Sequence, residues 1–143
     1  MTRNDILESL LVSSHRLVRI AAQRTGSTIP SATWRTLAIL EAEGPMRIGE
    51  LAKASRVTQP GMTRLLAGMV EEELVLRIAD TEDSRAWLIR VTAKGSRQLA
   101  EWRQTLAEQM QQDFQGLDAE EWALLARAAE LLESRIGSRA LAS

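Results

Sequence analysis

The sequence contains no cysteine and only one histidine among its 143 residues. A chain without cysteine forms no disulfide, carries no thiolate nucleophile or thiol-based redox sensor, and offers no sulfur ligand to zinc. The single histidine, His15, leaves little for a histidine-based metal site. We therefore expect no metal or other cofactor, and the absence of disulfides favours a cytoplasmic protein.

Long apolar runs and catalytic motifs are missing as well. No stretch approaches the roughly 20 consecutive apolar residues that a membrane span requires, so we expect no membrane partner. The sequence shows no glycine-rich phosphate loop and no nucleophile–base pair, and the acidic run at 71–73 is more simply a solvated helix end than a catalytic site. We expect no enzymatic activity.

Excess charge of one sign is also absent, since the formal net charge is −1. This total hides a gradient along the chain. Residues 47–97 carry nine basic against seven acidic side chains, whereas residues 98–143 carry four against eight. A surface that binds phosphate is therefore expected in the middle third, with the acidic C-terminal segment turned away from it.

The periodicity of apolar residues predicts a mainly α-helical domain with a small β-hairpin. Helices are expected over 5–24, between Ser31 and Gly44, in two short pieces within 46–69, and from Thr92 to about Phe114. A last helix should open at the capping box formed by Asp118 and Glu121, and the chain end after it, 138–143, is expected to fray. The segments 75–79 and 87–91 alternate like strands and flank the polar loop 80–85.

Two short helices followed by a hairpin are typical of the winged helix-turn-helix. The second short helix of such a motif lies in the major groove of DNA, and Thr58 is suited to cap it. In the hairpin loop, or wing, Arg85 is expected to enter a minor groove while Asp83 orients it. The candidate DNA-binding residues are Thr58, Gln59, Pro60, Gly61, Thr63, Arg64, Asp83 and Arg85.

The apolar residues of the last helix step by three and four positions, which is the spacing of a helix–helix seam. This seam could pack within one subunit, but the terminal helices carry more apolar surface than a small DNA-binding lobe can cover. We favour a dimer interface that includes Ile6, Leu10, Trp122, Leu125, Leu132 and Ile136. The other tryptophans are expected mostly in the core.

Several of these strings, in this order and spacing, resemble the MarR family of transcriptional regulators. The resemblance rests on 48–52 (IGELA), 57–65 (VTQPGMTRL), 74–77 (LVLR), and 80–86 (DTEDSRA) through 91–95 (VTAKG). It implies one domain, with a DNA-binding lobe at about 32–97 and dimerisation helices at about 1–31 and 98–143. It further implies a homodimer that binds a palindromic operator, usually as a repressor.

The resemblance also implies an effector, often a small aromatic or phenolic acid, bound between the dimerisation helices and the DNA-binding lobe. The residues expected near such a site are His15, Arg16, Arg19 and Trp34. An arginine suits a carboxylate ligand because its guanidinium can pair with both oxygens. The alternative, that these are ordinary surface or interface side chains, stays open.

Two residues depart from the family pattern. Glu73 stands where glycine commonly ends the second short helix, so either the helix runs on or Glu73 accepts a strained conformation. Ser84 stands where a second basic residue often accompanies the wing arginine. A further alternative keeps the winged-helix fold but uses it only for protein contacts. Such a module should carry acidic or apolar residues where this chain has Gln59, Thr63 and Arg64.

Overall fold

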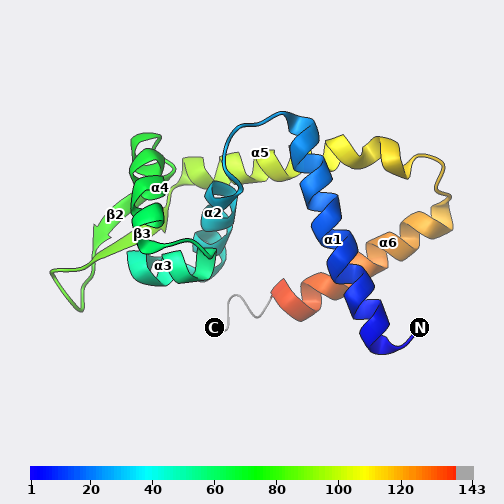
Figure 1. Ribbon diagram of the computed structural model, residues 1–143, viewed down its shortest axis with the longest axis horizontal. Helices are drawn as coiled ribbons and strands as arrows, with labels where there is room; N and C mark the ends of the chain where they lie inside the picture. Colours follow the sequence, from blue (N-terminus) through cyan, green and yellow to red (C-terminus); the bar gives the residue numbers. More distant parts are fainter. Residues whose placement is uncertain (138–143) are drawn as a thin grey trace. The chain divides into compact units, whose positions relative to one another are not determined.

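The computed structural model describes residues 1–137; residues 138–143, where the sequence predicts a frayed end, lie outside the described residues. Two compact units divide the chain, residues 1–28 with 101–117 and residues 29–100 with the segment from 118 onward. Figure 1 shows the helices and the small sheet. The prediction of a mainly helical protein with a small β-wing is confirmed.

The first unit contains helix α1 (Arg3–Thr25), the second half of helix α5 (Ala93–Met110) and the 3₁₀ turn η1 (Gln111–Phe114). A capping box of Thr2 and Asp5 opens α1. In the last turn of α1, Arg24 forms an ion pair with Asp113 and also donates a hydrogen bond to the carbonyl oxygen of Gln109 at 3.1 Å. These contacts join the C-terminal end of α1 to the end of α5.

The second unit contains a winged-helix lobe built around one hydrophobic core. Helices α2 (Ser31–Glu43), α3 (Ile48–Ser55) and α4 (Gln59–Glu71) each turn an apolar face toward it. Their burial removes apolar surface from water, which is the main favourable contribution to folding. The buried core residues are Leu37, Leu40, Leu51, Ala52, Met62, Leu66, Met69, Leu74, Val75, Ile89 and Leu99.

The sheet has three antiparallel strands in the order β1-β3-β2. Strands β2 (Val75–Ala79) and β3 (Trp87–Val91) form the expected hairpin. Strand β1 (Met46–Arg47) pairs with β3 through Met46 opposite Ile89. The assignment of residue 46 onward to a helix is therefore wrong for these two residues, because a two-residue strand is too short to show an alternating pattern.

The connection between α4 and β2 requires a left-handed residue. Glu73 has φ 63°, so of the two outcomes expected for this position the strained conformation is the one found. The carbonyl groups left open at the end of α4 find donors from the start of α5. The hydroxyl of Thr92 donates to the Glu73 carbonyl at 2.6 Å and Lys94 Nζ to the Glu72 carbonyl at 2.8 Å.

The C-terminal helices begin at the predicted caps. The Thr92 hydroxyl accepts a hydrogen bond from the Gly95 amide at 3.0 Å, and Asp118 and Glu121 form the capping box of α6 (Ala119–Leu132), which a π-helical turn, η2 (Glu133–Gly137), follows. Helix α5 ends at Met110 rather than near Phe114, the last four residues forming η1 instead. Within residues 1–137, none of the helices has the length and apolar character needed to cross a membrane.

The start of α5 lies close to the backbone before β2, and Gly95 is the residue at this close approach. A Cβ at this position would overlap the Leu74 carbonyl oxygen and lie 3.0 Å from Cγ2 of Val91. We expect Gly95→Ala to lower the free energy of unfolding by about 1–3 kcal/mol, because the overlap forces the backbone to shift. Urea unfolding followed by circular dichroism measures this change.

Gly68 provides the matched control, since it also lies in a helix and a Cβ there meets no atom within 4 Å. Gly68→Ala should raise the free energy of unfolding by about 0.5–1 kcal/mol. Equal stability of Gly95→Ala and the wild-type protein would contradict the close approach at Leu74.

Candidate nucleic-acid interface

Helices α3 and α4 are joined by a tight turn that the sequence encodes locally. Arg56, the C-cap residue of α3, has φ 61° and ends the helix in the left-handed conformation. Thr58 then caps α4 by accepting a hydrogen bond from the Gly61 amide at 3.1 Å. A Cβ at Gly61 would lie only 2.9 Å from the Thr58 hydroxyl oxygen, so the absence of a side chain there leaves room for the cap.

Helix α2 forms hydrogen bonds to the last residue of α3, next to this turn. The buried hydroxyls of Thr36 and Ser55 are 3.1 Å apart and form a hydrogen bond between α2 and the last residue of α3. Nε of Arg35 donates to the Ser55 carbonyl oxygen at 2.7 Å. The end of α3 is therefore tied to α2 by two contacts, which hold the start of α4 in place.

The two faces of α4 differ sharply in burial. Met62, Leu66 and Met69 are buried in the core, whereas the opposite face leaves its polar side chains exposed. A Cβ built at Gly49 would lie 3.5 Å from Oε1 of Gln59, so this side chain lies beside the first turn of α3. The exposed residues of α4 include Gln59, Pro60, Thr63, Arg64 and Ala67.

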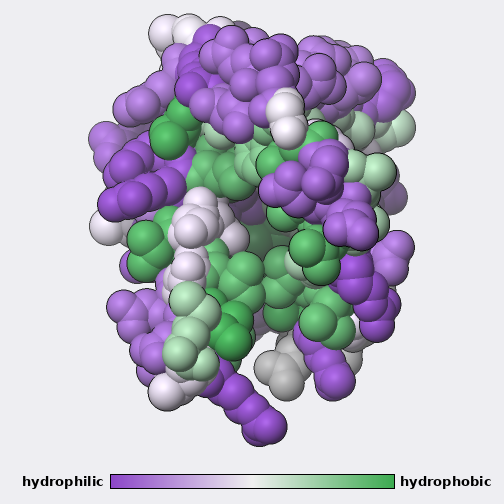
Figure 2. Space-filling view, turned by 90° about the vertical axis from the view of Figure 1, so that its right-hand side faces the viewer, coloured by the Kyte–Doolittle hydropathy of each residue, from purple (hydrophilic) through white to green (hydrophobic). Residues whose placement is uncertain are grey.

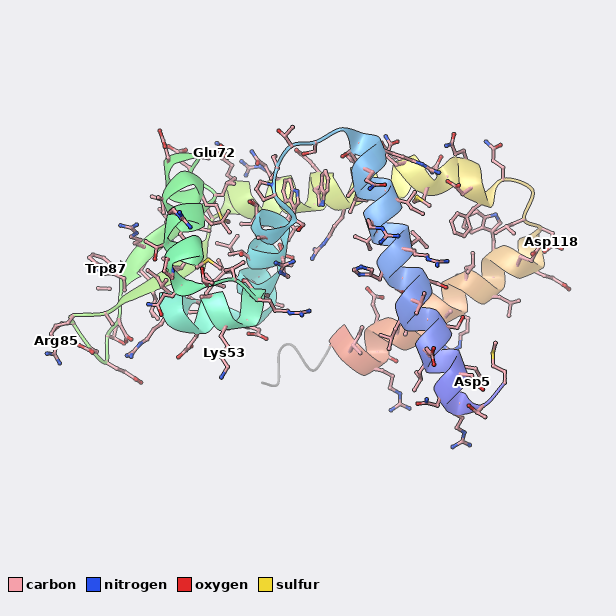
Figure 3. The ribbon with its side chains drawn as sticks, in the orientation of Figure 1. Asp5, Lys53, Glu72, Arg85, Trp87 and Asp118 are labelled. Atoms are coloured by element: carbon pink, nitrogen blue, oxygen red, sulfur yellow. The ribbon has the colours of Figure 1, made fainter. Side chains whose placement is uncertain are left out.

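Arg85 lies at the tip of the loop between β2 and β3, where Figure 3 shows its side chain directed away from α3 and α4. The side chain is 91% exposed, and its Nε lies 3.5 Å from Oδ1 of Asp83. The same carboxylate oxygen accepts a hydrogen bond from the Arg85 amide at 3.0 Å. Asp83 therefore contacts both the backbone and the guanidinium of Arg85, while the guanidinium stays open to solvent.

A second ion pair lies at the base of this loop and was not expected from the sequence. Nε and Nη2 of Arg47 donate to Oδ2 of Asp80 at 2.9 and 2.7 Å, and the Asp80 side chain is only 9% exposed. Oδ1 of Asp80 accepts a hydrogen bond from the Glu82 amide at 2.9 Å. The Glu82 amide, followed by the Arg47 guanidinium, holds the pKa of Asp80 below its usual range.

Trp87 is 55% exposed and Trp122 is 50% exposed. The expectation of a core position is therefore wrong for Trp87, which pairs with Ala79 at the end of the hairpin next to the loop. Ile89, two residues further along β3, is buried in the core, whereas Trp87 is not. The indole of Trp87 lies on the wing in Figure 3.

The residues expected near an effector lie in different parts of the chain. His15, Arg16 and Arg19 are exposed on α1, in the first compact unit. Trp34 belongs to the second unit and packs against the core of the winged-helix lobe. The effector site stays a prediction. Among residues 1–137, His, Asp and Glu side chains form no group of three or more that could hold a metal ion.

The residues expected at a dimer interface are all exposed in the single chain. Every residue of α6 is exposed, and residues 3–19 of α1 are exposed as well. Figure 2 shows exposed hydrophobic side chains bordered by hydrophilic ones. The exposed fractions of the predicted interface residues are Ile6 45%, Leu10 38%, Trp122 50%, Leu125 40%, Leu132 40% and Ile136 64%.

Comparison with known proteins relates this chain to DNA-binding regulators. The family model of the MarR family matches residues 29–87. The HTH-type transcriptional repressor IacR of Pseudomonas putida is 27% identical over 99 residues, which span 69% of this chain and 59% of IacR. An HTH-type transcriptional regulator of Mycobacterium tuberculosis is 31% identical over 96 residues, which span 67% of each chain.

Solved structures share the fold over nearly the whole chain. Rv1404 of Mycobacterium tuberculosis superposes with a TM-score of 0.69 at 23% identity, covering 96% of both chains. Wild-type MarR of Escherichia coli gives 0.61 at 20% identity, covering 92% of this chain and 97% of MarR. BpsR of Bordetella bronchiseptica, whose DNA binding is regulated by 6-hydroxynicotinic acid, gives 0.58 at 20% identity over 92% and 93%.

The lowered pKa of Asp80 predicts a dependence of stability on pH. The carboxylate contributes stability above the ordinary aspartate pKa of about 3.9, and that contribution disappears as pH falls through the lower pKa of the folded state. We expect Asp80→Asn to lower the free energy of unfolding at pH 7 and to lower it less at pH 3. Urea unfolding at both values measures the difference between the variant and the wild-type protein.

Glu82→Gln is the matched control, because the exposed Glu82 contributes its backbone amide to this network rather than its carboxylate. Its difference from the wild-type protein should stay small at both pH values. A gap between Asp80→Asn and wild type that is the same at pH 7 and pH 3 would contradict a lowered pKa.

Proposed function

Because this chain belongs to the MarR family of transcriptional regulators, we propose that it binds a palindromic DNA operator as a homodimer and represses transcription. Helix α4 lies in the major groove and the wing contacts the neighbouring minor groove. One observation carries the proposal: α4 buries one stripe and leaves Gln59, at its first residue, and Thr63 and Arg64 exposed, in the same lobe as the exposed Arg85.

The exposed side chains of α4 offer groups suited to base edges. Gln59 can make two hydrogen bonds to adenine, and Arg64 can do the same with guanine or bind a phosphate. The Thr63 hydroxyl donates to the Gln59 carbonyl oxygen at 3.0 Å, so it meets DNA as an acceptor and leaves its methyl group for a thymine methyl. The amides at the capped start of α4 add a favourable dipole toward phosphate.

The wing supplies a positive charge at some distance from α4. Narrow minor grooves have an enhanced negative potential that attracts arginine. The Arg85 guanidinium is 91% exposed and borders Asp83, which orients it without enclosing it. Ser84 adds no second charge, so Arg85 carries the electrostatic part of the wing contact.

The partner that we propose for the exposed helices is a second copy of this chain. Isolated surface leucines are ordinary, but continuous apolar stripes of this kind mark interaction surfaces. On α6 and η2 the stripe of Trp122, Leu125, Leu132 and Ile136 has the spacing of a helix–helix seam. A two-fold dimer also matches a palindromic operator, whose half-sites are about one helical turn apart.

We further propose that a small aromatic or phenolic acid relieves binding. The regulation of BpsR by 6-hydroxynicotinic acid supports this class of ligand. Arg16 and Arg19 supply exposed guanidinium groups that could pair with its carboxylate. Titrating such acids into the protein–DNA complex tests this part: failure of every acid to release the duplex would count against it.

DNA binding itself is tested by letting the full chain select duplexes from a random-sequence library. An inverted repeat should be enriched. On that duplex, Arg85→Ala should weaken binding by about tenfold or more, because one charge-assisted contact is lost. Affinity should also fall steeply with salt concentration. Fluorescence anisotropy measures both quantities.

Arg127→Ala on α6 is the control for Arg85→Ala, since it removes the same charge outside the winged-helix lobe. It should bind as the wild-type protein does. Enrichment of no sequence would overturn the DNA-binding proposal in favour of a protein-interaction module. Unchanged affinity of Arg85→Ala would overturn the wing contact alone.

The dimer is tested by truncating the seam of α6. Trp122→Ala combined with Leu132→Ala should produce monomers at concentrations where the wild-type protein is dimeric, because both side chains lose their apolar contact area. Analytical ultracentrifugation measures the oligomeric state.

Leu124→Ala combined with Leu131→Ala is the matched control, because these leucines are exposed on the same helix but lie off the seam. This variant should stay dimeric. Dissociation of the control with retention of the dimer in the seam variant would place the interface on another face of α6.

A further inference from the structure

The ion pair between Arg47 and Asp80 joins two parts of the winged-helix lobe that are 33 residues apart in sequence. Arg47 is the N-cap residue of α3, the first helix of the helix-turn-helix. Asp80 is the first residue after β2 and therefore begins the wing loop. The contact connects the start of the helix-turn-helix directly to the base of the wing.

The register of the sheet explains how this contact is made. Arg47 lies opposite Leu88, and Leu88 lies opposite Ile78. Directly opposed residues share a face of the sheet, and Asp80 follows Ile78 by two positions, which continues that face. The side chain of Arg47 therefore passes across β3, on the side of Leu88, to reach a carboxylate beyond the end of β2.

The same carboxylate organises the loop that follows. Its Oδ2 accepts both hydrogen bonds from Arg47, and its Oδ1 accepts one from the Glu82 amide. The loop is then closed by the Asp80 amide, which donates to the Ala86 carbonyl at 3.2 Å, and by the Ala86 amide, which donates to the Asp83 carbonyl at 3.0 Å. Asp83 in turn accepts from the Arg85 amide.

A continuous set of contacts thus runs from Arg47 through Asp80 and Asp83 to Arg85. The contact of Arg47 with Asp80 also contributes to stability, but solvent screens that contribution because the Arg47 side chain is 44% exposed. Ordering a loop before binding, by contrast, lowers the entropy cost of the contact that the loop makes. The chain of contacts ends at the one side chain of the loop that is almost fully exposed and positively charged.

We propose that Arg47 and Asp80 are positioning residues for the wing. Their contact fixes the position of Arg85 relative to α4, so that Arg85 and α4 reach the same DNA duplex. This inference rests on the proposed function. Asp80 acts through the loop rather than by touching DNA, since its carboxylate is 9% exposed and repels phosphate.

The sign of one substitution separates positioning from simple electrostatics. Removing a carboxylate from a DNA-binding lobe should strengthen binding if only charge mattered, because a repulsive group within a Debye length disappears. Positioning predicts the opposite for Asp80→Ala, which should bind the selected duplex about two- to tenfold more weakly. Glu82→Ala, the matched control two residues away, should bind as tightly as the wild-type protein or more tightly.

A double-mutant cycle with Arg85 tests the route of the effect. If Asp80 acts through Arg85, Asp80→Ala should cause no further loss of affinity in a protein that already carries Arg85→Ala. A general loosening of the lobe would instead lower affinity by the same factor in both backgrounds. Anisotropy titrations of the four proteins on the selected duplex measure the coupling.

Arg47→Lys gives an independent test that does not depend on how Asp80→Ala folds. Lysine keeps the charge but loses the planar guanidinium whose Nε and Nη2 both contact Oδ2. If Arg47 positions the wing, Arg47→Lys should weaken binding, and this loss of affinity should be absent in a protein that already carries Arg85→Ala. If Arg47 contacted only phosphate, lysine would preserve most of the affinity.

The possible results separate this inference from the function on which it rests. Weaker binding of Asp80→Ala and Arg47→Lys, confined to the background with Arg85, supports positioning. Equal or tighter binding of Asp80→Ala, or a loss that persists without Arg85, overturns positioning while the proposed DNA contact stands. Unchanged affinity of Arg85→Ala on its own overturns the wing contact and positioning together.

Discussion

Burial of one stripe of α4 is the constraint on which the rest of the lobe depends. Met62, Leu66 and Met69 are at most 3% exposed, and each fully buried side chain of this size contributes about 1.5–3 kcal/mol. Since a helix turns once in 3.6 residues, burying this stripe turns Thr63 and Arg64 outward, while Gln59 lies exposed as the first residue of the helix. The face that we propose to bind DNA is therefore a consequence of how the core is filled.

Much of this arrangement is predictable because it is local. The turn into α4 needs a capping hydroxyl and a glycine, and Thr58 and Gly61 provide them three residues apart. Thr92 and Asp118 likewise cap the starts of α5 and α6, as their sequence contexts predict. The contacts that sequence reasoning missed are long-range. Arg47 reaches Asp80 only because a two-residue strand joins the sheet, and neither the strand nor the contact leaves a periodic signal.

Glu73 and Trp87 are single residues whose structure the local sequence does not determine. A non-glycine residue at the end of α4 leaves two outcomes open, and the structure shows the left-handed one, with Thr92 and Lys94 bonded to the carbonyls of Glu73 and Glu72. Trp87 is a residue type typical of the core, but it lies exposed at the loop end of the hairpin. The seam on α6 has a spacing that the sequence shows, but the surface that covers it is not given by the fold of the single chain.

A weakly acidic protein that binds DNA depends on where its positive charges lie, because its overall field does not attract the duplex. The loop of the wing has three acidic side chains, Asp80, Glu82 and Asp83, and the single basic side chain of Arg85, so its net charge opposes DNA binding.

The contacts of two of these acids explain how Arg85 can still reach DNA. Asp80 is turned inward and paired with Arg47, and Asp83 is bonded to the backbone and side chain of Arg85. Two of the three acids thus face other groups of the loop and its base, where they hold the loop in one conformation. The guanidinium is left exposed at the tip, and Asp80 and Asp83, which lower the net charge of the wing, are the groups that we propose direct Arg85 outward.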